Sequence, residues 1–188
     1  MKKITSFCVD HTKLTEGIYI SRIDGDCITY DMRVCRPNTG LLMDNSTIHT
    51  TEHMMATFLR NSEIAEDVIY FGPMGCQTGF YLIVRDKIAK EKVLDVVKAC
   101  LQKTLEYDGE VFGNSAIECG NYINLDLAKA KRVCGLYLSI LENTKEILNY
   151  EELNWQMYYN ICFLFVKNIQ KKLKNSKKSG KKAKNVIQ

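Results

Sequence analysis

The sequence lacks several features that would assign it directly to a class of protein. It has no run of about 18 or more apolar residues, so we expect no membrane-spanning helix. The opening residues, MKKITSFCVDHTK, carry two lysines without the apolar stretch of a secretory signal, which favours a cytoplasmic location. The chain has no internal repeat. It contains only three histidines, two of which lie within one short stretch.

The eight cysteines are scattered through the chain and form no CxxC pair. A chain of 188 residues can bury a sizeable core, so it does not need a disulfide framework. We therefore expect most of the cysteines to be small, buried apolar side chains in a reducing compartment.

Basic side chains are scarce outside the C-terminal end. The stretch from Lys167 to Gln188 holds nine of the 26 basic residues and no acidic one, which leaves 17 basic and 22 acidic side chains in the rest of the chain. A nucleic-acid-binding fold would instead show basic patches interleaved with aromatic residues through its body. The sequence therefore predicts no nucleic-acid partner.

The order of apolar segments predicts a single α+β domain. The segments IYISRI and CITYDMRV flank Asp24-Gly25, a strong hairpin turn, and FYLIVR is typical of a short buried strand. Helices are expected after a cap at Asn45 or Ser46, over residues 90–106, and over about 125–143. Strands and helices do not alternate as βαβ units, which favours a mainly antiparallel sheet packed by helices. In the second hairpin strand Arg33 falls on the face opposite the apolar residues, toward solvent, a partner or a site.

The stretch IHTTEHMMATFLRN brings together residues that can bind a metal. His49 and His53 are one helical turn apart and project from the same face, so two imidazole nitrogens can converge on one ion. Glu52 lies close enough to act beside the ion without being a ligand. A solvated helix face with two incidental histidines is the alternative. H-x-x-E-H is also the signature of inverted zinc peptidases, which would take a downstream carboxylate as third ligand.

Two cysteines flanked by glycine come later in the chain. Cys76 in GPMGCQTGF lies in a turn that leaves the sulfur accessible and lets backbone N–H groups approach it, which favours a thiolate. Cys119 in IECGNY lies in a loop beside Gly120, a good position for a metal ligand. Taken singly, each cysteine is more often inert than functional.

Taken together, IHTTEH, PMGCQTGFY and ECG, in this order and at these spacings, resemble the LuxS family of S-ribosylhomocysteine lyases. The segments SF…DHTK and YDMRVCRPN match as well. The resemblance implies a LuxS-like catalytic domain over residues 1–150. Residues 151–173 are then an additional C-terminal helix, and residues 174–188 a disordered Lys-rich tail. We interpret these extra parts as an amphipathic cap and a solubilising tail, with contact with an anionic surface as the alternative.

The resemblance also implies the roles of individual residues. Matching family positions make His49, His53 and Cys119 the ligands of one divalent metal per subunit, Fe(II) with Zn(II) or Co(II) able to substitute. Glu52 and Cys76 match the two acid/base residues. The family is a homodimer with active sites at the interface. The matching substrate-binding candidates, contributed in part by the other subunit, are Ser6, His11 and Arg33, and Arg60 is added because it shares the helical face of His53.

The implied reaction converts S-ribosylhomocysteine into homocysteine and 4,5-dihydroxy-2,3-pentanedione, the precursor of autoinducer-2. The thioether is remote from the aldehyde, so the carbonyl first migrates along the ribose in two enediolate steps. Elimination then releases the thiolate of homocysteine, with the metal acting as a Lewis acid. A signalling role and a role in methionine recycling both stay open.

The sequence departs from the family pattern at two positions. Tyr70 stands where an acidic residue is common, and Gly72 replaces a serine. If that acid binds the homocysteine amine, substrate recognition is altered here. An inverted zinc peptidase and a catalytically inactive metal-binding module remain as alternatives, but the first would leave Cys119 and PMGCQTG without a purpose.

Overall fold

A β-hairpin begins the fold, in a computed structural model that describes residues 1, 7–150 and 152. Strand β1 (Gly17–Asp24) pairs antiparallel with β2 (Cys27–Arg33). Gly25 has a φ of 59°, a left-handed conformation that glycine adopts without steric cost. Asp24 pairs with Cys27, so the turn consists of Gly25 and Asp26, one position later than predicted.

The hairpin forms the centre of a five-stranded sheet with the order β3-β4-β2-β1-β5. Strands β3 (Val68–Pro73) and β4 (Gly79–Arg85) add antiparallel neighbours on one side, and the two-residue strand β5 (Leu148–Asn149) pairs parallel with β1 on the other. The predicted α+β fold with a mainly antiparallel sheet is therefore confirmed. Strands β3 and β5 were not predicted.

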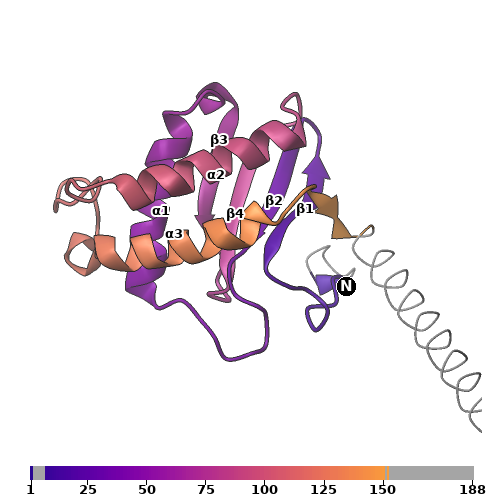
Figure 1. Ribbon diagram of the computed structural model, residues 1–188, viewed down its shortest axis with the longest axis horizontal. Helices are drawn as coiled ribbons and strands as arrows, with labels where there is room; N and C mark the ends of the chain where they lie inside the picture. Colours follow the sequence, from indigo (N-terminus) through magenta and orange to yellow (C-terminus); the bar gives the residue numbers. More distant parts are fainter. Residues whose placement is uncertain (2–6, 151, 153–188) are drawn as a thin grey trace, which may run out of the picture. The chain divides into compact units, whose positions relative to one another are not determined.

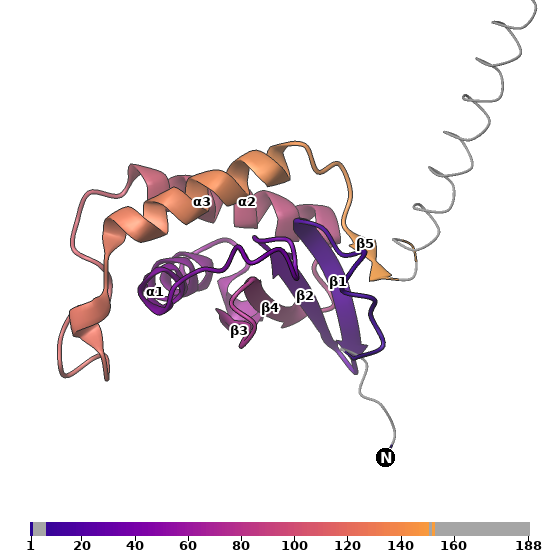
Figure 2. The same cartoon turned by 90° about the horizontal axis from the view of Figure 1, so that it is seen from below.

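Three helices cover one face of this sheet (Figures 1 and 2). They are α1 (Asn45–Arg60), α2 (Lys90–Glu106) and α3 (Leu127–Glu142). Helix α2 has the predicted bounds. The predicted cap of α1 at Asn45 or Ser46 is wrong, because the Asp44 carboxylate accepts a hydrogen bond of 2.7 Å from the Thr47 N–H and so caps the helix. Among the described residues no helix is long and apolar enough to cross a membrane.

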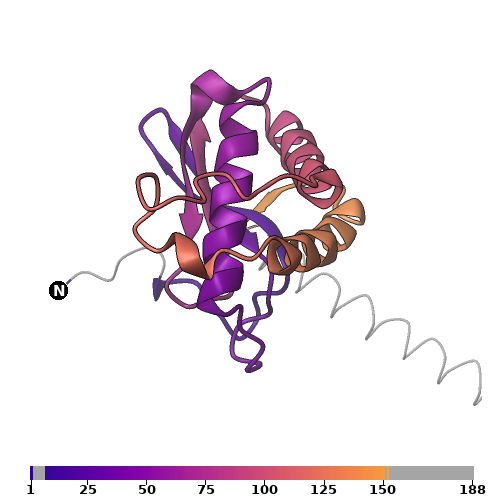
Figure 3. The same cartoon turned by 90° about the vertical axis from the view of Figure 1, so that its left-hand side faces the viewer.

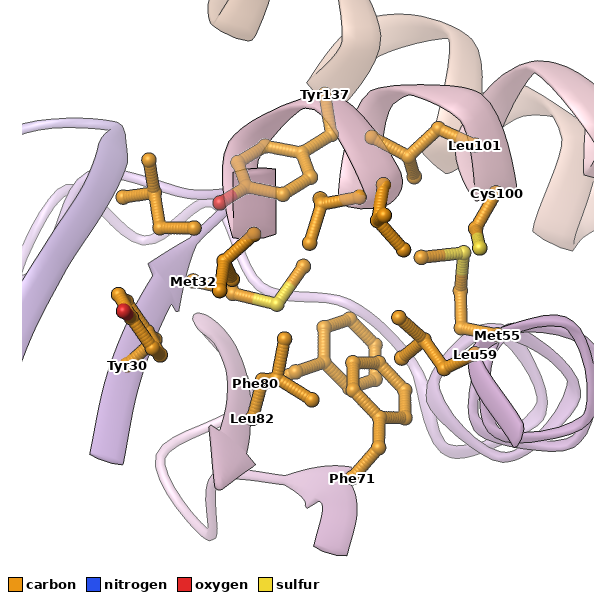
Figure 4. Packing of buried hydrophobic residues seen from close by; sticks show 14 of the residues in the cluster. Tyr30, Met32, Met55, Leu59, Phe71, Phe80, Leu82, Cys100, Leu101 and Tyr137 are labelled. Carbon is orange, nitrogen blue, oxygen red and sulfur yellow. The ribbon is translucent and has the colours of Figure 1, made fainter. Parts of the chain in front are cut away.

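The main hydrophobic core lies between the helices and the inner sheet face (Figure 4). Phe71 and Phe80 stack at a ring-centroid distance of 5.2 Å, and Met55 and Leu59 of α1 are almost completely buried among core residues. Burying side chains of this size stabilises the fold by about 1.5–3 kcal/mol each. This packing fixes α1 in position, with its histidines on the side away from the core.

The cysteines do not behave as predicted. Of the seven described, all free, only Cys100 and Cys134 are buried, so the expectation that most are buried apolar residues is wrong. The other five lie near the N-terminus, at the hairpin turn or in connecting loops, and of these Cys35 is partly buried against the edge of the core. Cys162, the expected C-terminal helix apart from Glu152, and the Lys-rich tail lie outside the described residues.

Candidate metal centre and active site

Helix α1 and a long loop bring three potential metal ligands together. Ring nitrogens of His49 and His53 and the sulfur of Cys119 all lie within 4.8 Å of one another. The Cys119 Sγ is 3.3 Å from His49 Nε2, and the two imidazole rings meet edge to face at 4.6 Å. All three residues are half-buried. This spacing suits a single ion bound by two nitrogens and one sulfur, with a fourth position left open.

Hydrogen bonds determine which nitrogen of each histidine faces the site. His49 Nδ1 lies 2.6 Å from Asn124 Oδ1, and His53 Nδ1 lies 2.7 Å from the Phe112 carbonyl oxygen. Both oxygens accept hydrogen bonds, so each Nδ1 carries the hydrogen and each Nε2 presents a lone pair toward Cys119. Such bonds orient metal-binding imidazoles and increase their basicity. The residues therefore fit a divalent metal.

The loop that carries Cys119 runs alongside α1 (Figure 3), and side chains of the helix bond to its backbone after Cys119. Ser46 Oγ donates to the Asn124 carbonyl oxygen in the short 3₁₀ helix η3 (Tyr122–Asn124), and Thr50 Oγ1 accepts from the Asp126 N–H. Gly113 has a φ of 71°, and a Cβ there would lie 3.1 Å from His53 Nδ1. Glycine thus lets the loop pass close to the imidazole.

Glu52 lies on α1 one residue before His53. Its side chain is half-buried, and it makes no hydrogen bond or ion pair with the part of the chain that the structure describes. The carboxylate is therefore available for proton transfer.

A second cluster surrounds Cys76 in the β3–β4 turn. The Cys76 Sγ is 3.0 Å from Thr78 Oγ1 and 3.6 Å from the Arg33 guanidinium, which also donates to Thr78 Oγ1 at 2.5 Å. Arg33 is only 2% exposed, and two of its nitrogens donate to the buried Asp31 carboxylate. The prediction that Arg33 faces away from the core is confirmed, but the side chain is buried beside Cys76 and Asp31 and not solvated.

The surroundings of Cys76 lower its pKa below the ordinary value of a cysteine. Burial raises the pKa of the thiol, but hydrogen bonds from the Thr78 hydroxyl and N–H and the positive charge of Arg33 outweigh it. The causes are thus the Arg33 guanidinium at the end of β2 and the hydroxyl and N–H of Thr78 just before β4, of which the sequence had suggested only the backbone N–H. The structure records no contact between Cys76 and the His49–His53–Cys119 group among the described residues.

The remaining candidates are dispersed. His11 Nδ1 bonds to the Val9 carbonyl oxygen, and Arg60 donates to the carbonyl oxygens of Val68 and Ile69, so that it joins the end of α1 to β3. Ser6 lies outside the described residues.

The two departures from the family pattern are in contact. Tyr70 is 46% exposed on β3, and a Cβ added to Gly72 would lie only 2.0 Å from the Tyr70 hydroxyl oxygen. The tyrosine ring therefore lies across the glycine.

Comparison with known proteins agrees with these features. A sequence model described as S-ribosylhomocysteinase (LuxS) matches residues 4–148. The chain belongs to the LuxS family. It is 44% identical over 150 residues to the S-ribosylhomocysteine lyase of Finegoldia magna and 45% identical over 151 residues to that of Borreliella afzelii, in each case covering 78% of this chain and 96% of the relative. It is also 40% identical to the lyase of Clostridium acetobutylicum, over 81% of this chain and all of the relative.

Sequence reasoning missed the residues that support the LuxS-type site. Asn124 and Phe112 orient the two histidines, and Thr78 and Asp31 surround the Cys76–Arg33 pair. Thr78 could have been predicted from the sequence, since it lies two positions after Cys76 at the end of the same glycine-flanked turn. Asn124 and Phe112 gave no signal, because the residues that they contact are far away in sequence.

Proposed function

We propose that this protein is an S-ribosylhomocysteine lyase that releases homocysteine and 4,5-dihydroxy-2,3-pentanedione, the autoinducer-2 precursor. The observation that carries the proposal is the convergence of two oriented Nε2 atoms and one sulfur in a chain of the LuxS family. The relatives that share 40–45% of their residues with this chain are named S-ribosylhomocysteine lyases.

His49, His53 and Cys119 are the proposed ligands of one divalent metal per subunit, Fe(II) in the cell with Zn(II) or Co(II) as substitutes. Imidazole and thiolate suit several of these ions. When bound, the metal supplies Lewis acidity, which polarises the carbonyl of the sugar at each stage.

Glu52 and Cys76 are the proposed proton-transfer residues. Moving a carbonyl along the ribose requires that a proton be removed from one carbon and returned to its neighbour, and the final elimination requires one more removal. The pKa of Cys76 is lowered from its ordinary value by Thr78 and Arg33, which supports its role as a base, and Arg33 stabilises the thiolate between transfers. Glu52 is uncommitted beside His53 and suits transfer near the metal.

The active form is proposed to be a homodimer with a site at each end of the interface. No described helix covers the outer face of the sheet, which carries Tyr70, Tyr81 and Ile83 together with the Arg33–Cys76 cluster. Tyr70 is 46% exposed on this face, and aromatic side chains of this kind are enriched at interaction surfaces. A partner placed there would contribute His11 or Ser6 to the substrate pocket, with Arg60 at the amino-acid end, and these substrate contacts remain proposals.

The peptidase alternative receives less support from the geometry. An inverted zinc peptidase would need a carboxylate as third ligand, and among the described residues the third donor beside His49 and His53 is the Cys119 thiol. A cytoplasmic location and a catalytic domain that ends near residue 150 complete the proposal.

The test is release of a free thiol from S-ribosylhomocysteine by the Co(II)-loaded protein, with 4,5-dihydroxy-2,3-pentanedione measured in parallel. Wild type should produce both products in equal amounts, and Cys119→Ala should lose metal and activity together. Absence of both products from a protein with full metal occupancy would refute the proposed reaction. Full occupancy in Cys119→Ala would refute the ligand assignment.

A further inference from the structure

The hydroxyl group of Thr78 lies between a cation and the proposed base. Thr78 is 3% exposed, and its Oγ1 is 2.5 Å from the Arg33 guanidinium and 3.0 Å from Cys76 Sγ. We propose that Thr78 is a positioning residue that holds Cys76 as a thiolate by donating its hydroxyl hydrogen to the sulfur. The inference rests on the proposed function, in which Cys76 transfers protons, and names a residue on which that role depends.

The direction of the hydrogen bond follows from the chemistry of the three groups. A guanidinium can only donate, so Thr78 Oγ1 accepts from Arg33. The hydroxyl hydrogen then needs an acceptor, and within the described part of the chain the sulfur of Cys76 is the acceptor in reach. A sulfur that accepts from both Thr78 and Arg33 has the hydrogen-bond pattern of a thiolate.

The surrounding sheet holds this arrangement in place. The Thr78 carbonyl oxygen accepts from the N–H groups of Val34 and Cys35 at 3.0 and 2.9 Å. Gly79 follows at a point where an added Cβ would lie 2.3 Å from the Met32 carbonyl oxygen, so the two strands approach unusually closely. Asp31 holds the other side of the guanidinium at 2.5 and 3.1 Å, which aims its remaining nitrogen at Thr78.

Among the residues that the structure describes, the charged and titratable groups near the sulfur come from three neighbouring strands. Arg33 and Asp31 come from β2 and Tyr81 from β4, while Arg22 of β1 acts on Tyr81 from farther away. Of these Arg33 lies nearest to the sulfur, and its charge is fixed over the accessible pH range. The Cys76 sulfur is therefore stabilised as a thiolate by one permanent charge, that of Arg33, and by one neutral hydrogen-bond donor, the Thr78 hydroxyl.

Alkylation by iodoacetamide tests the inference without substrate, because only the thiolate reacts. The rate of modification of Cys76 is followed by peptide mass spectrometry across a pH series, in full-length protein loaded with Zn(II). The pH at which Cys76 reacts at half its maximal rate is the midpoint of this series. In Thr78→Val the midpoint should rise by about one to two pH units, the effect of losing a hydrogen bond to a charged acceptor. Thr78→Ser keeps a hydroxyl and should keep the wild-type midpoint.

Thr104→Val is the matched control, because it removes a buried hydroxyl that bonds to the Cys100 carbonyl oxygen on α2, away from the site. Its midpoint should equal that of wild type. If Thr78→Val does not fold, Thr78→Ala removes the same hydroxyl and carries the same expectation. An unchanged midpoint without the Thr78 hydroxyl, or an equal rise in Thr104→Val, would overturn the inference. Because alkylation does not depend on turnover, a protein that fails to cleave S-ribosylhomocysteine still gives a decisive result here.

Discussion

Each imidazole of the proposed metal site uses one nitrogen inside the protein and leaves the other for the ion. The Asn124 side chain supplies this support to His49, and the backbone carbonyl of Phe112 supplies it to His53. A mutation of Asn124 can remove the hydrogen bond to His49, whereas no side-chain substitution removes the backbone carbonyl that bonds to His53. The two ligands therefore differ in how easily their orientation is lost.

Replacing Asn124 by alanine should weaken metal binding by about 10–100-fold, since His49 loses the partner that fixes its ring. Competition with a chelator for Zn(II) measures this. Asn121→Ala is the control, because the side chain of Asn121, three residues earlier in the same loop, makes no hydrogen bond with the described part of the chain. Equal affinities of the two variants would show that Asn124 does not orient the ligand.

Glu52→Gln and Cys76→Ala should keep the metal and lose most of the activity. Neither residue belongs to the ligand group, and a general acid or base typically contributes about 10²–10⁴-fold in rate. Metal content and thiol release are measured on the same samples. A Cys76→Ala enzyme within about threefold of the wild-type rate would remove that residue from the mechanism.

Because Tyr70 and Gly72 are in contact, we predict that substitutions at the two positions depend on each other. Gly72→Ser alone should displace the Tyr70 ring, because the added Cβ occupies the position of its hydroxyl group. Tyr70→Asp should tolerate Gly72→Ser and, if an acid at this position binds the homocysteine amine, should lower KM for S-ribosylhomocysteine. Steady-state kinetics of the two single variants and the double variant measure the coupling. Additive effects would mean that the two positions are independent.

At the scale of elements, the local signals in the sequence succeeded where a pattern is long and failed where an element is short. Helix α2 has the predicted bounds because apolar residues recur along its 17 residues. Strand β3 was missed because its six residues end in Gly72 and Pro73, which resemble a loop. Strand β5 has two residues and depends entirely on β1 for its pairing. The three candidate metal ligands were predictable from motifs, but their supporting contacts depend on how distant segments pack.

The cap of α1 also joins two helices. Asp44 accepts from the Thr47 N–H and pairs with Lys129 of α3 at 2.9 Å. The hydrogen bonds from Lys129 and Thr47 lower the pKa of this carboxyl group to about 2. The ionised Asp44 carboxylate therefore stabilises the folded state fully above the pKa of this group in the unfolded chain, near 3.8. This stabilisation is lost as the pH falls toward about 2.

Asp44→Ala should destabilise the protein by about 1 kcal/mol at pH 7, the usual cost of losing a cap. Asp44→Asn keeps the capping oxygen but loses the charge that pairs with Lys129, so it should cost less. Urea unfolding at pH 7 and at pH 3 measures both variants, and the difference between wild type and Asp44→Asn should shrink at the lower pH. If the difference in unfolding free energy between wild type and Asp44→Asn does not depend on pH, the charge of Asp44 does not contribute and only the helix cap matters.

At the scale of the whole chain, basic charge is concentrated beyond residues 4–148, the part that matches the LuxS family model. Residues 174–188 contain six lysines and no acid, and their large aliphatic residues are only Val186 and Ile187. Truncation after Leu173 should therefore leave activity and dimer formation intact, because this stretch has too little apolar area to offset the entropy of ordering it.

Truncation after Asn149 should instead reduce solubility or stability, since Trp155, Tyr159 and Phe163 can form the apolar face of an amphipathic helix. Light scattering and thiol release compare the two truncated proteins with the full chain. Loss of activity on removing the lysines alone would show that the tail has a function of its own.

The short strand β5 has a consequence for how copies of this protein keep apart. It occupies the hydrogen-bonding groups of β1 at Tyr19 and Ile20, and farther along that strand Arg22 and Asp24 form an exposed ion pair. Exposed strand edges act as templates on which other chains polymerise, and charges and short covering strands prevent this. Leu148 and Asn149 thus cover this part of the β1 edge, and removing them would expose it to pairing with strands of other chains.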